Sequence, residues 1–152
     1  MDNARISTMD DVYHIAANMR KDDRNEVFAS GGMSPLKAMK KSFEYTEDCA
    51  TFLVNGKPAA MFGLKHTGLI TRTGIPWLLG TDDIQKDVYG FLKLSKVLYN
   101  YGISRCDYMY NFVDVRNTES QKWLKWMGFD VEEAQPYGLF GMPFKKFYKE
   151  VK

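Results

Sequence analysis

The segment Tyr108–Asp114 gathers side chains that could take part in chemistry. Because side chains alternate between the two faces of a strand, Tyr108, Tyr110, Phe112 and Asp114 are predicted to share one face. A lone carboxylate after three aromatic rings could form the polar end of a substrate pocket and accept a proton there. A solvated strand end is the alternative interpretation of Asp114.

Two predicted helices begin where strands end, at residues 82–90 and at Asn117. Ligands gather at that end of open α/β sheets, and unpaired amides at a helix N-terminus bind anions. Gly80 indicates a bulge, a bend or a close ligand approach. Helix capping explains Asn117 fully. Ser120, one turn later, either contacts a ligand or is a small residue at a tight contact between elements.

Composition and charge exclude several classes of protein. The 152 residues include 21 basic and 19 acidic side chains without a clustered basic face, so nucleic-acid binding is not expected. The apolar runs are far shorter than the roughly 20 residues that a membrane span needs. Cys49 and Cys106 lack metal-ligand spacing and are expected to be small buried residues. His14 and His66 have no partner at metal or triad spacing.

Hydrophobic periodicity and capping residues predict the element order βααβββαβαββ. Thr8 and Asp11 have capping-box spacing before an apolar stripe, and Ser34-Pro35 begins a second helix. Asn55-Gly56 predicts a hairpin. The expected strands are residues 4–7, 49–54, 59–64, 74–81, 108–115, 129–133 and 144–151, and the later helices are 82 or 83 to 101, ended by Gly102, and 117–127, ended by Gly128.

This order predicts one α/β domain over residues 1–152, with a mixed sheet. The strand–helix–strand unit from Trp77 to Val115 is expected to form a parallel crossover, next to the antiparallel hairpin. The C-terminal region holds more aromatic residues than one small core usually absorbs. A dimer or partner surface is therefore an alternative to core filling for some of them.

Two segments resemble the GNAT N-acetyltransferase family, and the element order is similar along nearly the whole chain. Residues 117–129 resemble the family stretch Asn-x-x-Ala-x-x-x-Tyr-x-x-x-Gly-Phe, with Asn117, Gly128 and Phe129 in register. Residues 78–90 resemble its strand-to-helix passage, which ends in (Gln/Arg)-x-x-Gly-x-(Gly/Ala), with Gln85 and Gly90 matching. The resemblance implies a mostly antiparallel central sheet with about four helices.

The resemblance also implies a site for acetyl-CoA or another acyl-CoA. The strand residues Leu78, Leu79 and Gly80 would pair with the pantetheine arm and stabilise an oxyanion. The cofactor diphosphate would meet backbone amides at the next helix start, and the second helix start would contribute as well. The implied diphosphate residues are Gln85, Lys86, Asp87, Val88, Tyr89 and Gly90, and those of the second helix are Asn117 and Ser120.

Three features depart from the family pattern. Val88 replaces the first glycine of the loop, so a β-branched side chain stands where phosphate would approach. Asp82, Asp83 and Asp87 favour the helix dipole yet compete with a polyanionic ligand. Leu124 replaces the tyrosine that commonly protonates the departing thiolate.

The roles of acid and base must then fall to other residues. Asp114 and Glu133 are the predicted bases for an acceptor amine, and Tyr110 is a candidate proton donor together with Tyr89, Tyr108 and Ser120. Direct attack is expected, because neither cysteine stands where a covalent intermediate could form.

A closer resemblance, over residues 110–118 and 123–125, is to the acetyltransferase-like proteins of T7-type phages. Those proteins are associated with virion morphogenesis or the internal virion. Two functions are therefore predicted: an acyl-CoA-dependent N-acyltransferase, or a non-catalytic phage accessory, virion or host-interaction protein. The expected acceptor is a small-molecule or protein amine, and the expected partners include a second copy or a virion protein. The expected location is the cytoplasm, or a virion, with neither nucleic acid nor a membrane as partner.

Overall fold

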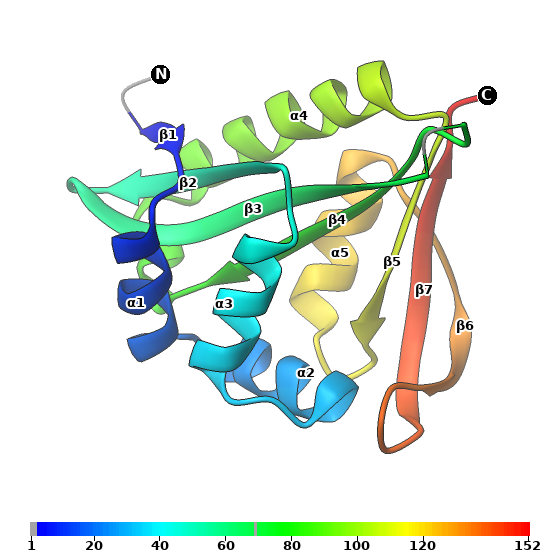
Figure 1. Ribbon diagram of the computed structural model, residues 1–152, viewed down its shortest axis with the longest axis horizontal. Coiled ribbons are helices and arrows are strands. Elements are labelled where there is room, and N and C mark those ends of the chain that lie inside the picture. The colour runs from blue at the N-terminus through cyan, green and yellow to red at the C-terminus, as the bar shows by residue number, and fades with distance from the viewer. Residues whose placement is uncertain (1–2, 69) are drawn as a thin grey trace.

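The computed structural model describes residues 3–68 and 70–152, which form one seven-stranded sheet flanked by helices (Figure 1). None of the helices in these ranges is long and apolar enough to cross a membrane. The strands are β1 (Ala4–Ile6), β2 (Asp48–Val54), β3 (Lys57–Thr67), β4 (Thr73–Gly80), β5 (Tyr108–Asp114), β6 (Asp130–Tyr137) and β7 (Met142–Glu150). The helices are α1 (Met9–Ala17), α2 (Lys21–Gly31), α3 (Pro35–Glu44), the 3-10 helix η1 (Asp82–Asp87), α4 (Val88–Arg105) and α5 (Thr118–Met127).

The strand order is β1-β2-β3-β4-β5-β7-β6. Among these neighbours β4 and β5 run parallel and the other pairs run antiparallel. The predicted α/β class with a mixed, mostly antiparallel sheet is confirmed. Local signals place several boundaries: Thr8 and Asp11 form a capping box, Ser34 caps α3, and Asn55-Gly56 turns with positive φ at both residues.

Three sequence predictions about helices are wrong. Helix α2 is an additional helix, giving five α-helices in the described residues where about four were expected. It escapes detection because its sequence is mostly polar and no side chain caps its start. Gly102 lies inside α4 instead of ending it. Its lack of a side chain makes room for Met109, whose Sδ a Cβ at this position would meet at 2.7 Å. The expected helix start at Asp82 or Asp83 is the 3-10 helix η1, and α4 begins only at Val88.

Helices α1–α3 lie on one face of the sheet, and α4 and α5 lie on the other (Figure 1). Strand alternation divides the core accordingly. Met61 and Leu79 pack with α1 and α3, whereas Phe62 packs with α4. Phe144 and Phe147, from the aromatic C-terminal region, are buried in this core, while Trp126 and Phe140 stay exposed.

Strands β4 and β5 separate soon after they meet. They pair at Thr73–Tyr108 and Gly74–Met109, and Figure 1 shows them diverging toward their C-terminal ends. The Asn111 side chain donates a hydrogen bond to the Pro76 carbonyl at 2.8 Å, close to the point of divergence. Beyond this point backbone groups of both strands need other partners, because unpaired amides inside a protein are costly.

Helix α2 supplies those partners with two acidic side chains. Asp23 Oδ2 accepts from the Gly80 amide at 2.8 Å, at the end of β4. Glu26 Oε1 accepts from the Asp114 amide at 2.9 Å, at the end of β5. Residues three apart lie on the same side of a helix. One turn of α2 therefore bridges the two separated strands.

The Asp23 contact predicts a measurable stability loss. In Asp23→Ala the buried Gly80 amide and the Arg20 guanidinium, which lies 2.7 Å from Asp23, both lose their acceptor. We expect a loss of about 3 kcal/mol in the free energy of unfolding, measured by denaturant titration. The adjacent, exposed Asp22→Ala is the matched control and should change stability by less than about 0.5 kcal/mol. Equal effects of the two variants would contradict the bridging role.

Candidate functional site

A cleft of about 200 Å³ lies where β4 and β5 diverge, between α2 and α5. We call it the strand cleft. Its apolar wall comes from both strands and from α5, and its acidic end comes from α2. Its lining residues include Arg20, Asp23, Glu26, Pro76, Trp77, Leu78, Leu79, Asn111, Phe112, Ser120, Trp123, Leu124, Tyr137 and Phe147.

Glu26 is the titratable group in the strand cleft that is best suited to accept a proton. Burial raises the pKa of its carboxyl to about 7, and the charge of Asp23 adds to the rise. Its hydrogen bonds from the Asp114 amide and from Asn117 Nδ2, the latter at 3.4 Å, oppose the rise and fix one carboxyl oxygen. A carboxylate with a pKa near neutrality can exchange a proton with a substrate at physiological pH.

Tyr137 is a tyrosine that lines the same cleft. Its ring stacks on Phe112 with 4.0 Å between centroids. Burial raises the pKa of the Tyr137 phenol, with a smaller contribution from Tyr110. The hydroxyl is therefore protonated at neutral pH and able to donate a proton.

The three predicted catalytic residues do not line this cleft. The Asp114 side chain is buried against Arg116, with an ion pair between Asp114 Oδ2 and Arg116 Nη2 of 2.6 Å. Burial alone would raise the pKa of Asp114, but the Arg116 contacts outweigh it and lower the pKa, which makes this carboxylate a weak base. Glu133 is exposed on the edge strand β6. Tyr110 stacks on Tyr108 at 5.8 Å, with Lys146 Nζ 5.4 Å from the Tyr110 ring.

Of the three residues predicted to meet the pantetheine arm, Leu78 and Leu79 line the strand cleft. Gly80 has its backbone engaged with α2: its amide donates to Asp23, and its carbonyl accepts from the Arg20 amide at 2.9 Å. A Cβ at Gly80 would meet Ile84 Cδ1 at 2.6 Å. The absence of a side chain at Gly80 makes room for Ile84. The group that approaches this glycine closely in the structure is therefore Ile84, where the sequence suggested a ligand.

The predicted diphosphate loop is closed by one of its own acids. The Asp87 side chain accepts from the Gly90 amide at 3.0 Å and caps α4. A Cβ at Gly90 would clash with this carboxylate, which explains the glycine. The carboxylate stands at the helix start, where a phosphate would otherwise bind. The other predicted loop residues, Gln85, Lys86, Val88 and Tyr89, are exposed, and Val88 does not plug the cleft.

At the start of α5, Asn117 caps the helix by accepting from the Ser120 amide at 3.2 Å. Its amide group donates to Glu26, so the cap also orients the candidate base. Ser120 and Leu124 line the strand cleft. Leu124 presents only an apolar surface where the family pattern has a tyrosine.

Neither cysteine is suited to act as a nucleophile. Burial, together with the charges of Asp48 and Glu47, raises the pKa of the Cys49 thiol to about 11. Burial likewise raises the pKa of Cys106. Within residues 3–68 and 70–152, no cluster of histidine, cysteine, aspartate and glutamate side chains could hold a metal ion.

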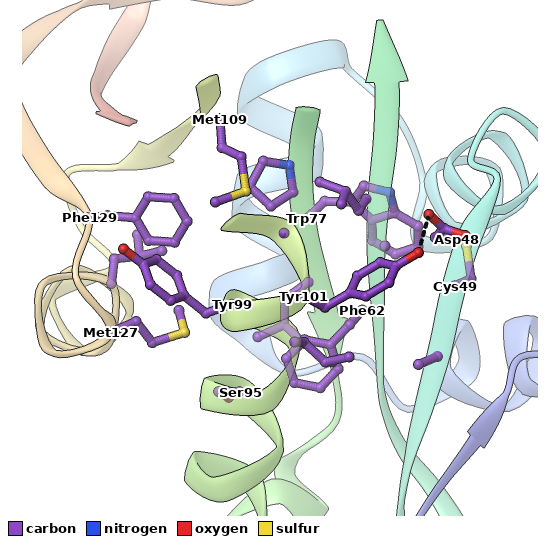
Figure 2. A pocket seen from close by; sticks show the side chains of 18 of the residues that line it. Asp48, Cys49, Phe62, Trp77, Ser95, Tyr99, Tyr101, Met109, Met127 and Phe129 are labelled. Carbon is purple, nitrogen blue, oxygen red and sulfur yellow. Dashed lines mark hydrogen bonds between the residues drawn. The ribbon is translucent and has the colours of Figure 1, made fainter. Parts of the chain in front are cut away.

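A second, larger cavity lies on the other side of the sheet, between α4 and strands β2–β4 (Figure 2). Its volume is about 380 Å³, and its walls are mostly apolar. Figure 2 shows Tyr101 reaching across one end toward Asp48, to which its hydroxyl donates at 3.3 Å. We call this space the apolar cavity.

The structure resembles solved acetyltransferases over nearly its whole length. A GNAT-family acetyltransferase from Streptococcus pneumoniae superposes with a TM-score of 0.66 and 11% identity over 98% of both chains. The spermidine N-acetyltransferase of Vibrio cholerae, solved with CoA and spermine, gives 0.68 and 14% over 97% of this chain and 96% of that chain. The fold is that of the GNAT acetyltransferases.

A third GNAT-fold structure is the ribosomal-protein-alanine N-acetyltransferase from Brucella melitensis. It gives a TM-score of 0.70 and 11% identity over 97% of this chain and 98% of that chain. No family model matches the sequence, and no curated protein matches it. At these identities the likeness establishes the GNAT fold, and function has to be argued from the site.

Sequence reasoning missed Glu26 and Tyr137. The available signal for Glu26 was its spacing of three from Asp23 within a polar helix, which places two acids on one side. That spacing is also typical of a solvated helix surface, so it does not single out a buried pair. Tyr137 reaches the cleft because β7 lies between β5 and β6, a strand order that sequence alone does not fix.

The raised pKa of Glu26 predicts a pH-dependent stability. A carboxyl whose pKa rises from 4.5 to about 7 on folding favours the folded state below pH 4.5, and this contribution is lost as pH increases through 7. Relative to Glu26→Gln, the wild type should therefore lose about 2–3 kcal/mol between pH 4.5 and pH 8.

Denaturant titrations across this pH range measure the difference. Glutamine keeps an oxygen acceptor for the Asp114 amide, so the comparison isolates ionisation. Glu133→Gln, which removes an exposed carboxyl outside the cleft, is the matched control. If both variants change the pH profile alike, Glu26 is not the group responsible.

Proposed function

We infer that the protein is an N-acyltransferase that moves an acyl group from a thioester of the coenzyme A type to an amine. The observation that carries this proposal is Glu26, a cleft carboxyl with a pKa of about 7, placed where the strands of a GNAT fold diverge. The Glu26 carboxylate, which has no ion-pair partner of its own among the described residues, also favours a positively charged amine as the acceptor.

The reaction follows from two proton carriers on one cleft. The ammonium form of the acceptor gives a proton to the Glu26 carboxylate. The free amine then attacks the thioester carbonyl carbon and forms a C–N bond. As the C–S bond breaks, the departing thiolate takes a proton from the Tyr137 hydroxyl. The nitrogen loses its second proton, which returns through solvent to the Tyr137 phenolate, and Glu26 releases its proton to solvent. Direct attack agrees with the raised thiol pKa of Cys49 and Cys106.

The residues present provide contacts for only part of an acyl-CoA donor. Leu78 and Leu79 line the cleft beside which a pantetheine arm would lie, and Ser120 lines the cleft at the start of α5. The diphosphate of coenzyme A has no comparable place, since Asp87 already accepts from the Gly90 amide. Binding of the diphosphate requires this carboxylate to leave the helix start.

The Asp87–Gly90 contact and Leu124 favour a second candidate function. A chain that fills its own phosphate position and has leucine at the usual proton-donor position fits a non-catalytic protein on the GNAT fold. The sequence resemblance to phage proteins suggests an accessory, virion or host-interaction role for such a protein.

Activity measurements separate the two candidates. With acetyl-CoA and octanoyl-CoA as donors and a panel of primary amines, we expect thiol release whose kcat/KM rises with an apparent pKa near 7. Glu26→Gln should lower kcat/KM roughly 100- to 1,000-fold and remove this pH dependence, while Glu133→Gln should not. If thiol release with every amine and both donors is no faster than in buffer without protein, the non-catalytic function is favoured.

Removing the Asp87 carboxylate should improve coenzyme A binding. Asp87→Ala frees the Gly90 amide and removes a negative charge, so we expect roughly tenfold tighter binding by calorimetry. The lost cap should lower stability by about 1 kcal/mol. Asp87→Asn keeps an acceptor at the cap without the charge and should give a smaller gain. Unchanged affinity in both variants would show that Asp87 does not compete with the diphosphate.

A further inference from the structure

The apolar cavity and the strand cleft approach the same wall from opposite faces of the sheet. Six residues line both spaces: Pro76, Trp77, Leu78, Trp123, Leu124 and Phe147. Strands β4 and β5 form no ladder pairs here, since their pairing ends at Gly74 and Met109. The gap in the sheet therefore separates the two spaces by side chains alone.

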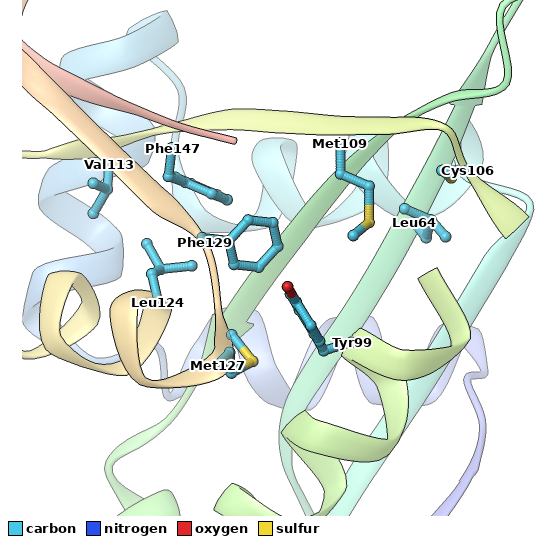
Figure 3. Packing of buried hydrophobic residues seen from close by; sticks show 9 residues of the cluster. All are labelled: Leu64, Tyr99, Cys106, Met109, Val113, Leu124, Met127, Phe129 and Phe147. Atoms are coloured by element: carbon cyan, nitrogen blue, oxygen red, sulfur yellow. The ribbon is translucent and has the colours of Figure 1, made fainter. Parts of the chain in front are cut away.

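The apolar cavity lies between two parts of the core. One wall belongs to the cluster shown in Figure 3, of which Leu64, Tyr99, Met109, Leu124, Met127, Phe129 and Phe147 line the cavity. The opposite wall comes from Phe62, Leu78, Leu98 and Trp123 of the neighbouring cluster. Trp123 is held between α5 and α4 by a hydrogen bond to Ser95 Oγ at 3.1 Å. The walls of the cavity are thus held in place by helices and strands of the core.

We propose that the apolar cavity holds the hydrocarbon chain of the acyl group, so that the donor is a medium-chain acyl thioester. The proposal rests on the acyltransferase function inferred above. The thioester lies in the strand cleft beside Leu78, and its chain enters the apolar cavity by displacing the side chains that separate the two spaces in the gap between β4 and β5. Leucine at position 124 keeps this passage apolar, where a tyrosine would place a hydroxyl.

Charges at both ends of this path select a neutral occupant. The inner end meets Glu26 and the ion pair of Asp23 with Arg20 in the strand cleft, and the outer end is bordered by Glu47 and Asp48. A free fatty acid would have to place its carboxylate beside Glu26 or beside Glu47 and Asp48. An acyl thioester carries no charge at its carbonyl, so its chain can fill the cavity without that repulsion.

The volume sets the length of the chain. An apolar cavity of about 150 Å³ binds benzene, so 380 Å³ suits a chain of roughly eight to twelve carbons. Burying each methylene tightens binding roughly fourfold, equivalent to about 0.8 kcal/mol. Six added methylenes, only partly buried at the open end, should give at least about 100-fold tighter binding of an octanoyl than of an acetyl donor.

Calorimetric titration of the full chain with acetyl-CoA, octanoyl-CoA, the corresponding pantetheine thioesters and octanoate measures this ratio and its dependence on the thioester. Leu98→Trp fills the cavity from α4 and should reduce the octanoyl-to-acetyl ratio to below about tenfold. The matched control is Val97→Trp, which adds the same side chain at an exposed neighbour and should keep the ratio. Ala50→Leu fills the cavity from β2 and serves the same purpose if Leu98→Trp does not fold by circular dichroism.

The outcomes separate this proposal from the proposed function. Equal affinity for acetyl and octanoyl donors, together with Glu26-dependent transfer, overturns the acyl-chain proposal and leaves the acyltransferase. A chain-length ratio that survives in both cavity-filling variants overturns it as well. Octanoate binding without binding of any thioester overturns both. Octanoyl-CoA that binds no tighter than octanoyl-pantetheine supports the chain as the main anchor and points to a carrier-bound pantetheine thioester as donor.

Discussion

Two carboxylates on one turn of α2 hold the separated strands β4 and β5 in place. Parallel strands that stop pairing expose amides inside the protein, and each of these amides must find an acceptor. Asp23 accepts a hydrogen bond from the Gly80 amide, and Glu26 accepts one from the Asp114 amide. The cleft therefore stays open without unpaired amides at these two positions. The two carboxylates that bind these amides thus hold the gap in the sheet open and also place acidic groups at one end of the strand cleft.

The contact that stabilises the separated strands also sets the pKa of the Glu26 carboxyl. Drawing Glu26 into the cleft to bind a strand amide removes much of its carboxyl from water, and this burial is the main cause that raises its pKa to about 7. The neighbouring charge of Asp23 acts in the same direction. Because one carboxyl oxygen is fixed by the Asp114 amide, the other is free to exchange a proton with a substrate. The group that stabilises the split is thus also the base of the proposed reaction.

The sequence predicts the frame of this protein better than its site. Boundaries with a local cause, such as the Thr8 capping box and the Asn55-Gly56 turn, are read correctly because a few neighbouring residues decide them. Helix α2 is not, because its inward side carries Asp23 and Glu26 and so lacks an apolar stripe. Strand alternation favours Asp114 as a base, whereas the structure pairs that carboxylate with Arg116. Glu26 meets the end of β5 through a contact between residues far apart in sequence, which local patterns do not reveal.

The same reasoning explains how a donor would be held by a cleft with an acidic mouth. In a GNAT fold whose helix start is free, backbone amides and the helix dipole attract a diphosphate. Here Asp87 accepts a hydrogen bond from the Gly90 amide, and Asp23 accepts one from the Gly80 amide. These two backbone amides are therefore already hydrogen-bonded within the chain. Affinity for a thioester must then come from apolar contact. The apolar cavity behind the gap, with Leu124 in its wall, offers that contact to an acyl chain. A protein anchored to its donor in this way would discriminate acyl groups by length, because each buried methylene contributes to binding, while the diphosphate contributes little.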